Sequence, residues 1–118
     1  MADSIEFMAR TFDATVTSSD DEINHRILLE GITTTIGSTG MGVQGKTPTR
    51  VPPEEVLSWK GSKVYVRLYT AGRDLKNAHG TIQDISDAPE SRYRWFFAIR
   101  FKKPIRLSSL RVNRRKNE

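Results

Sequence analysis

The residues of this chain best suited to binding chemistry form a short turn rich in glycine, serine and threonine, Thr35–Val43. Ile32, Thr34 and Ile36 alternate with polar residues, which predicts a β-strand leading into the turn. Glycines in the turn permit positive φ and let a partner approach the backbone closely. Successive N–H groups in such a turn can form a concave site for an anion. The turn is therefore the first candidate binding site.

The basic C-terminal end of the chain is the second candidate. Residues 92–118 carry ten basic side chains and one acidic one, whereas residues 1–30 carry seven acidic and two basic side chains. The net charge of the whole chain is +5. This gradient predicts an anionic partner for the C-terminal end, an electrostatic clasp between the two ends, or a solvated tail. If the partner carries phosphates, the candidate contacts are Arg111, Arg114, Arg115 and Lys116.

Groups suited to catalysis are sparse. The chain has no cysteine, which excludes disulfides and thiolate zinc sites. His25 and His79 lie far apart and in no metal-ligand spacing. The run Gly61–Lys63 is too short for a phosphate-binding P-loop. The sequence predicts a binding module that is not an enzyme and that has no metal or resident cofactor.

The elements that must position these groups are mostly strands. Each predicted strand alternates apolar and polar residues, and turn-forming residues separate the strands. Gly31 is the expected bulge or bend of the second strand. The apolar residues after the turn, Met41 and Val43, begin a further strand. The other predicted strands are Phe12–Thr17, His25–Ile36, Lys63–Tyr69, Gly80–Ile85 and Tyr93–Phe101.

This pattern predicts an all-β fold, a small antiparallel β-barrel of about six strands with a short basic helix or tail after Pro104. We expect a flexible N-terminus at 1–9, the barrel at 10–105 and the basic tail at 106–118. Pro52–Trp59 predicts one helical turn. The predicted core consists of Phe12, Val16, Ile27, Leu29, Ile36, Val64, Val66, Leu68, Trp95, Phe97, Ile99 and Phe101.

Hydropathy bears on where the chain resides. No apolar run approaches the ~20 residues that a membrane helix needs. The acidic N-terminus does not resemble a signal peptide. The sequence therefore predicts a soluble, cytoplasmic protein without membrane insertion.

The order of these elements resembles a PilZ domain, a small bacterial β-barrel that serves as a receptor for cyclic diguanylate. Thr35–Gly40 occupies the position of the family motif Asp/Asn-x-Ser-x-x-Gly. Gly61–Leu68 matches the pattern Gly-x-x-Val-x-Val-x-Leu, and Phe97–Pro104 matches the last strand. The resemblance covers roughly residues 10 to 105. It implies an adaptor that binds a protein partner in a motility, pilus or exopolysaccharide pathway.

The chain departs from the family at the ligand motif. The acidic or amide residue and the serine that contact a guanine in the family are Thr35 and Gly37 here. Of the family's Arg-x-x-x-Arg before the first strand, only Arg10 is present. The same spacing recurs between Arg111 and Arg115, at the opposite end of the chain. The resemblance thus implies weakened or atypical cyclic diguanylate binding. The candidate ligand residues are Thr35, Ser38, Gly40, Arg10, Arg111, Arg114 and Arg115.

A basic SH3-like barrel that binds RNA or DNA is the alternative. Gly61–Val66, Gly72–Lys76 and Gly80–Ile82 together resemble a KOW element. The C-terminal charge favours it, because phosphate contacts supply most nonspecific affinity for nucleic acid. Tyr93, Trp95, Phe97 and Phe101 share one face of the predicted strand, which predicts a core contribution or, alternatively, a stacking platform for bases.

Overall fold

The computed structural model describes residues 11–19, 26–47, 50–70 and 73–110, except for the side chain of residue 109. Each strand follows an alternating run of apolar and polar residues, and one face of each run turns inward. The elements are β1 (Asp13–Ser18), β2 (Ile27–Ile36), β3 (Gly40–Lys46), α1 (Pro53–Leu57), β4 (Lys63–Thr70), β5 (Arg73–Asp87), β6 (Trp95–Phe101) and the 3-10 helix η1 (Leu107–Leu110).

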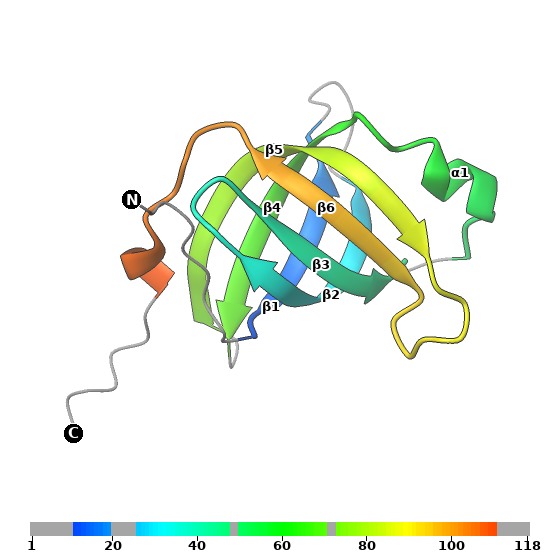
Figure 1. Ribbon diagram of the computed structural model, residues 1–118, viewed down its shortest axis with the longest axis horizontal. Coiled ribbons are helices and arrows are strands. Elements are labelled where there is room, and N and C mark those ends of the chain that lie inside the picture. Colours follow the sequence, from blue (N-terminus) through cyan, green and yellow to red (C-terminus); the bar gives the residue numbers. More distant parts are fainter. Residues whose placement is uncertain (1–10, 20–25, 48–49, 71–72, 111–118) are drawn as a thin grey trace.

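The six strands form a closed barrel in the order β1-β2-β3-β6-β5-β4, with every neighbouring pair antiparallel (Figure 1). Consecutive strands pair as hairpins within two three-stranded meanders, β1–β3 and β4–β6. The meanders join along two seams, β3 with β6 and β1 with β4. The predicted small antiparallel barrel of about six strands is confirmed. β5 extends well beyond the predicted Gly80–Ile85, because its first half pairs with β4 as a hairpin.

The core fills the interior of the barrel and follows the predicted faces. On β6, Trp95, Phe97, Ile99 and Phe101 all point inward and are buried. Eleven of the twelve predicted core residues are buried, and Ile27 is the exception at 40% exposed. The register between β1 and β2 shifts beside it, so that Leu28 is buried instead. Alternation alone cannot show this one-residue shift.

The glycines of the barrel allow strands to approach rather than to bend. The bulge expected at Gly31 is absent, because the register of β2 shifts at Leu28 and Thr34. Gly31 pairs with Gly45, and a Cβ on Gly31 would overlap the backbone oxygen of Gln44. Both glycines are therefore required by close backbone contact between β2 and β3.

The end of the barrel next to α1 is closed by apolar and aromatic side chains, and we call it the α1 end. Pro53 begins the helix, and Val56 is fully buried against the core. Trp59 packs edge to face on Phe97, with ring centroids 6.4 Å apart and an interplanar angle of 77°. The predicted helical turn at Pro52–Trp59 is thus present and covers this opening (Figure 1).

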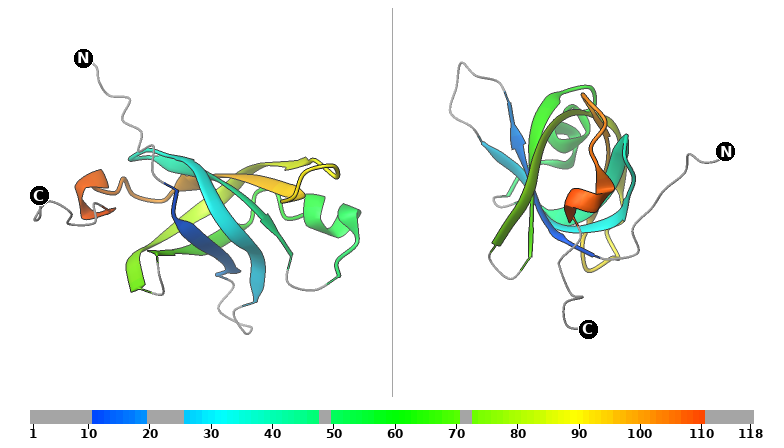
Figure 2. Two further views of the ribbon diagram at one scale, coloured as in Figure 1. Left: turned by 90° about the horizontal axis from the view of Figure 1, so that it is seen from below. Right: turned by 90° about the vertical axis from the view of Figure 1, so that its left-hand side faces the viewer.

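The opposite end is covered by the chain that follows β6. η1 lies across this opening when the barrel is viewed along its axis (Figure 2, right). Leu110 is fully buried and Ile105 is 9% exposed, so both belong to the core. A short basic helix or tail is predicted after Pro104, and the described residues there include the 3-10 helix Leu107–Leu110. No helix in the described part of the chain is long and apolar enough to cross a bilayer.

Candidate functional site

The structure places the described members of the predicted ligand set on the β2–β3 hairpin. Thr35 is an exposed residue of β2, Ser38 lies in the turn and Gly40 begins β3. These three residues are close in sequence and in space. Arg10, Arg111, Arg114 and Arg115, the remaining candidates, lie outside the described residues.

The hairpin turn is packed against the chain after β6. The backbone N–H of Phe101 donates to the Thr39 carbonyl at 2.8 Å, and that of Ile105 donates to the Ser38 carbonyl at 2.8 Å. Within the turn, the Gly37 N–H donates to the Gly40 carbonyl at 2.8 Å. This N–H group is therefore already used inside the turn. An anion at the hairpin would depend on the remaining donors and on side-chain hydroxyls.

The glycines of this hairpin do not use their freedom to adopt positive φ. Among the described glycines, positive φ occurs at Gly61, at 92°. Gly40 and Gly42 are strand residues instead. A Cβ on Gly40 would lie 2.6 Å from the Ile99 carbonyl oxygen, and one on Gly42 would lie 2.7 Å from Phe96 Cε1. They are explained by strand packing, so they do not by themselves indicate a ligand.

The chain entering β1 is held at the same end of the barrel. The Phe12 N–H donates to Thr33 Oγ1 at 2.9 Å, and the Thr33 N–H donates to the Phe12 carbonyl at 2.9 Å. Thr33 is 1% exposed, and its hydroxyl thus receives a partner where water cannot reach it. Two segments far apart in sequence, residues 11–12 and 101–105, flank the β2–β3 hairpin. We call this end of the barrel, formed by these segments and the start of β5, the groove end.

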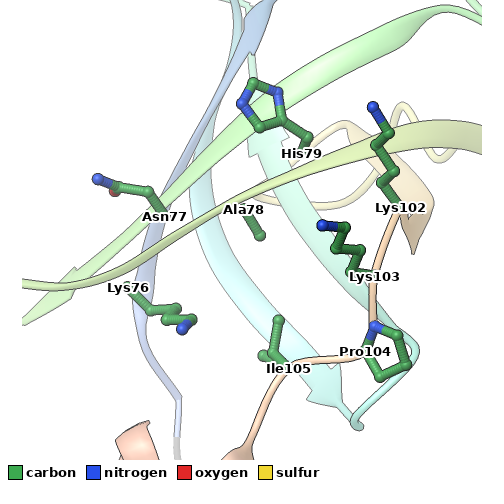
Figure 3. Close-up of a pocket in the computed structure, with 8 residues that line it drawn as sticks. All are labelled: Lys76, Asn77, Ala78, His79, Lys102, Lys103, Pro104 and Ile105. Carbon is green, nitrogen blue, oxygen red and sulfur yellow. The ribbon is translucent and has the colours of Figure 1, made fainter.

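A groove that the sequence did not reveal opens at the groove end, between β5 and the chain after β6 (Figure 3). It exists because β6 ends at Phe101, opposite Gly80, while β5 continues. The chain bends at Lys102 and Lys103 directly after β6, and Pro104, which follows, cannot donate a ladder hydrogen bond. The cavity volume is about 390 Å³. We call it the lysine groove; its lining residues are Lys76, Asn77, Ala78, His79, Lys102, Lys103, Pro104 and Ile105.

The lysine groove carries positive charge without compensation from the described residues. Its lining includes three lysines and no carboxylate, and none of these lysines forms an ion pair with a described residue. The nearby carboxylate of Asp74 is bound to Arg67 at 3.0 Å. Figure 3 shows Ala78 and Ile105 pointing into the space between the two segments. The groove thus combines an apolar floor with a cationic rim, which suits an anionic partner that also brings apolar groups.

Sequence reasoning missed this groove although a signal was present. Lys102 and Lys103 directly precede a proline at the end of a strand, and Lys76 lies in the hairpin partner of β4. Lys76 pairs with buried Leu68, so it lies on the inner face, where a long aliphatic stem can pack while the ammonium stays in water. His79 is exposed and lies within β5, with its ring 4.9 Å from that of Tyr65.

Metal binding finds no support in the part of the chain that the structure describes. No group of three or more His, Asp or Glu side chains gathers there in a way that could hold an ion. Asp87 is the carboxyl group with the clearest perturbation, and its pKa is lowered because Arg94 donates hydrogen bonds to it. This pair lies at the α1 end and is exposed to solvent. The ion pair links the last residue of β5 to the residue before β6, and it does not indicate a metal site.

Comparisons with known proteins bear on the fold. No protein-family model matches the chain, and no curated protein matches it in sequence. Among solved structures, it is similar to that of the Bacillus subtilis inhibitor of motility (MotI/DgrA), with a TM-score of 0.57 and 8% sequence identity. The match covers 92% of this chain and 46% of that protein, so this chain spans about half of its length. At this identity the likeness establishes a shared fold.

Proposed function

We propose that this chain is a PilZ-like adaptor domain in bacterial motility-related signalling that acts by binding a protein partner in the cytoplasm. The observation that carries the proposal is the similarity of the whole barrel to a motility inhibitor over 92% of this chain. The resemblance of Thr35–Gly40 and Gly61–Leu68 to PilZ motifs is an independent support from the sequence. A pilus or exopolysaccharide pathway would use the same kind of adaptor.

The same proposal includes weak or atypical binding of cyclic diguanylate and no catalysis. Thr35 offers a hydroxyl where the family motif has a carboxylate or amide, and position 37 offers no side chain. A buried guanine edge left without partners costs about 1–3 kcal/mol for each group. In the turn, the Gly37 N–H already donates to the Gly40 carbonyl and so does not face a ligand. Any substantial affinity must therefore come from Arg10 or from the C-terminal arginines.

The alternative, a barrel that binds RNA or DNA, is less well supported by the described residues. The aromatic face of β6 is buried, with Trp95, Phe97 and Phe101 each at most 5% exposed. These rings are therefore unable to stack on bases. The lysines of the groove end could still contact phosphates electrostatically. Measuring the affinity for nucleic acid at several salt concentrations separates such contacts from base stacking.

Two measurements test the proposal. Calorimetric titration of cyclic diguanylate should give weak binding, reduced further by the substitutions Arg111→Gln, Arg114→Gln and Arg115→Gln. Point substitutions are preferable to truncation at residue 106, because truncation would remove the buried Leu110. Tight binding that survives all three substitutions would contradict the weak-binding prediction. Independently, expression of the chain in a swimming bacterium should alter the diameter of its swimming zone, and an unchanged zone would contradict the adaptor function.

A further inference from the structure

One stretch of the barrel has an unpaired strand edge. β5 pairs with β6 only from Gly80 onward, whereas its first half, Arg73–His79, pairs with β4 alone. After Phe101 the chain makes one further backbone hydrogen bond to β5, in which the Lys102 N–H donates to the His79 carbonyl at 2.8 Å. It then turns toward the β2–β3 hairpin, where the Ile105 N–H donates to the Ser38 carbonyl, and η1 lies close to β5 further on without pairing with it as a strand. The closed barrel thus leaves about half of its longest strand without a strand partner on one side.

The phase of the ladder shows which backbone groups occupy that side. The Ile82 N–H donates to the Ser62 carbonyl at 3.0 Å, toward β4. Because antiparallel ladders alternate, residues 80, 78 and 76 also bond toward β4, and residues 79 and 77 face the other way. The His79 carbonyl, which accepts from Lys102, follows this phase. The N–H and C=O of Asn77 therefore face the free side, and no described residue pairs with them.

The side chains along this edge define what it would accept. Asn77 is exposed, and its side-chain amide points away from the lysine groove in Figure 3. Ala78 and Ile105 form an apolar floor beside it. Lys76, Lys102 and Lys103 surround that floor. Lysines on an exposed edge disfavour pairing with neutral or basic strands, and they favour an acidic one.

We propose that the free edge Arg73–His79 of β5 accepts an extended, acidic segment of a partner protein as an added β-strand. The inference rests on the proposed adaptor function and assigns the surface through which it acts. Backbone hydrogen bonds to Asn77 supply the pairing, and an apolar side chain of the segment enters the lysine groove. Carboxylates on the segment meet the three lysines. The described lining has no Phe, Tyr or Trp, which favours a peptide over a single-stranded nucleic acid.

The test uses the full chain and a synthetic octapeptide of alternating glutamate and valine, with capped ends. Titration followed by amide chemical shifts should give saturable changes in Arg73–His79 and in Lys102–Ile105. The affinity should fall as salt rises, because part of it is electrostatic. An octapeptide of alternating lysine and valine and an oligothymidine of eight nucleotides serve as comparison probes. Neither should reproduce the pattern.

A backbone variant and its matched control isolate the strand pairing. Asn77→Pro removes the N–H that faces the free side, while the ladder to β4 keeps its hydrogen bonds. It should weaken binding of the acidic octapeptide about tenfold or more, because a hydrogen bond and the geometry of strand pairing are lost together. Asn77→Ala removes the same side chain but keeps the N–H. It should bind like the wild type.

A charge variant keeps the inference testable if Asn77→Pro does not fold. The triple substitution of Lys76, Lys102 and Lys103 by glutamine should abolish the salt dependence and weaken binding about tenfold or more. The matched control is the triple substitution of Lys46, Lys60 and Lys63 by glutamine, which removes the same charge at the α1 end. That control should bind the octapeptide with unchanged salt dependence.

Three results would overturn the inference. They are failure of the wild type to bind the acidic octapeptide at millimolar concentration, unchanged binding by a folded Asn77→Pro variant, and binding of the oligothymidine in place of the peptide through the same lysines. Swimming assays separate this inference from the adaptor function. If the groove variants alter swimming like the wild type, the adaptor function stands and the assigned surface is wrong.

Discussion

At the α1 end, three cations lie against carboxylates, whereas at the groove end three lysines have no carboxylate partner among the described residues. Arg26 bonds Glu55 at 3.3 Å, Lys60 lies 3.8 Å from Asp84, and Arg94 bonds Asp87 at 2.7 Å. Arg26 also lies over the ring of Trp59, at 5.6 Å from its centroid. At the groove end one comparable pair exists among the described residues, Arg67 with Asp74 at 3.0 Å, and it includes none of the three lysines of the lysine groove.

The groove end combines features that the α1 end lacks. Its lysines line a cavity, and the first half of β5 beside them lacks a strand partner on one side. Exposed ion pairs contribute little to stability, so the difference between the two ends is not mainly one of stability. It is a difference in what each end can offer to another molecule. Substitutions at the two ends should therefore differ in their effects on stability and on binding.

Replacement of Phe97 should have the largest effect, because its large side chain is fully buried in the core that both ends share. It is fully buried, pairs with Val43 and Ile85, and contacts Trp59. Phe97→Ala should cost about 3–5 kcal/mol in the free energy of unfolding measured by denaturant. A loss under about 1 kcal/mol would mean that the two faces of β6 are assigned the wrong way round.

A pair of leucines compares the ends more directly. Leu110 is fully buried at the groove end, whereas Leu57 is 47% exposed at the α1 end. Leu110→Ala should cost about 2–5 kcal/mol, and Leu57→Ala should change the free energy of unfolding by less than about 0.5 kcal/mol. Equal effects in denaturant melts would show that the chain after β6 does not complete the core.

The Asp87–Arg94 pair predicts an acid-sensitive contribution confined to the α1 end. The pKa of Asp87 lies below its ordinary value of 3.8 because Arg94 donates hydrogen bonds to the Asp87 carboxylate. The contribution is therefore fully present above pH 3.8 and is lost as pH falls through the lower folded value. Asp87→Asn should lower the melting temperature slightly at neutral pH, and the difference from wild type should vanish in acid. A difference that persists at low pH would point to a packing effect.

Neutralising the lysine groove should have the smallest effect on stability. Substitution of Lys76, Lys102 and Lys103 by glutamine removes like charges that have no described partner, so the free energy of unfolding should change by at most about 0.5 kcal/mol. The change should be a gain at low salt that disappears at high salt. A clear loss of stability would show that these lysines hold the fold together, and the comparison between the ends would then be wrong.

Sequence reasoning anticipated the barrel because burial on one face imposes a period of two. The run from Trp95 to Phe101 carries that period throughout, and all of its inward residues are buried. The prediction that Ile27 is buried was wrong, because the pairing of β2 with β1 causes the register shift beside it. The local pattern of apolar and polar residues does not contain this information. The same limit applies to Gly31, whose role is contact with another strand rather than a bend.

The candidate site was only partly accessible from the sequence. Thr35, Ser38 and Gly40 do share one hairpin, as their adjacency requires. The lysine groove was not foreseen, because it depends on β6 ending before β5 does and on the direction the chain takes after Pro104. Lys76 and Lys103 come together only through that termination. Whether the hairpin binds cyclic diguanylate stays a prediction.

The division of the barrel into two meanders has a consequence for how quickly the protein folds. Hairpins within each meander join neighbouring strands, whereas the seams β1–β4 and β3–β6 join segments such as Val16 with Val66 and Val43 with Phe97. Loop-closure entropy must be overcome before those distant pairings contribute. Folding should therefore be slow for the size of the chain, in the millisecond-to-second range typical of β-barrels. The two meanders would form first, and their joining would limit the rate.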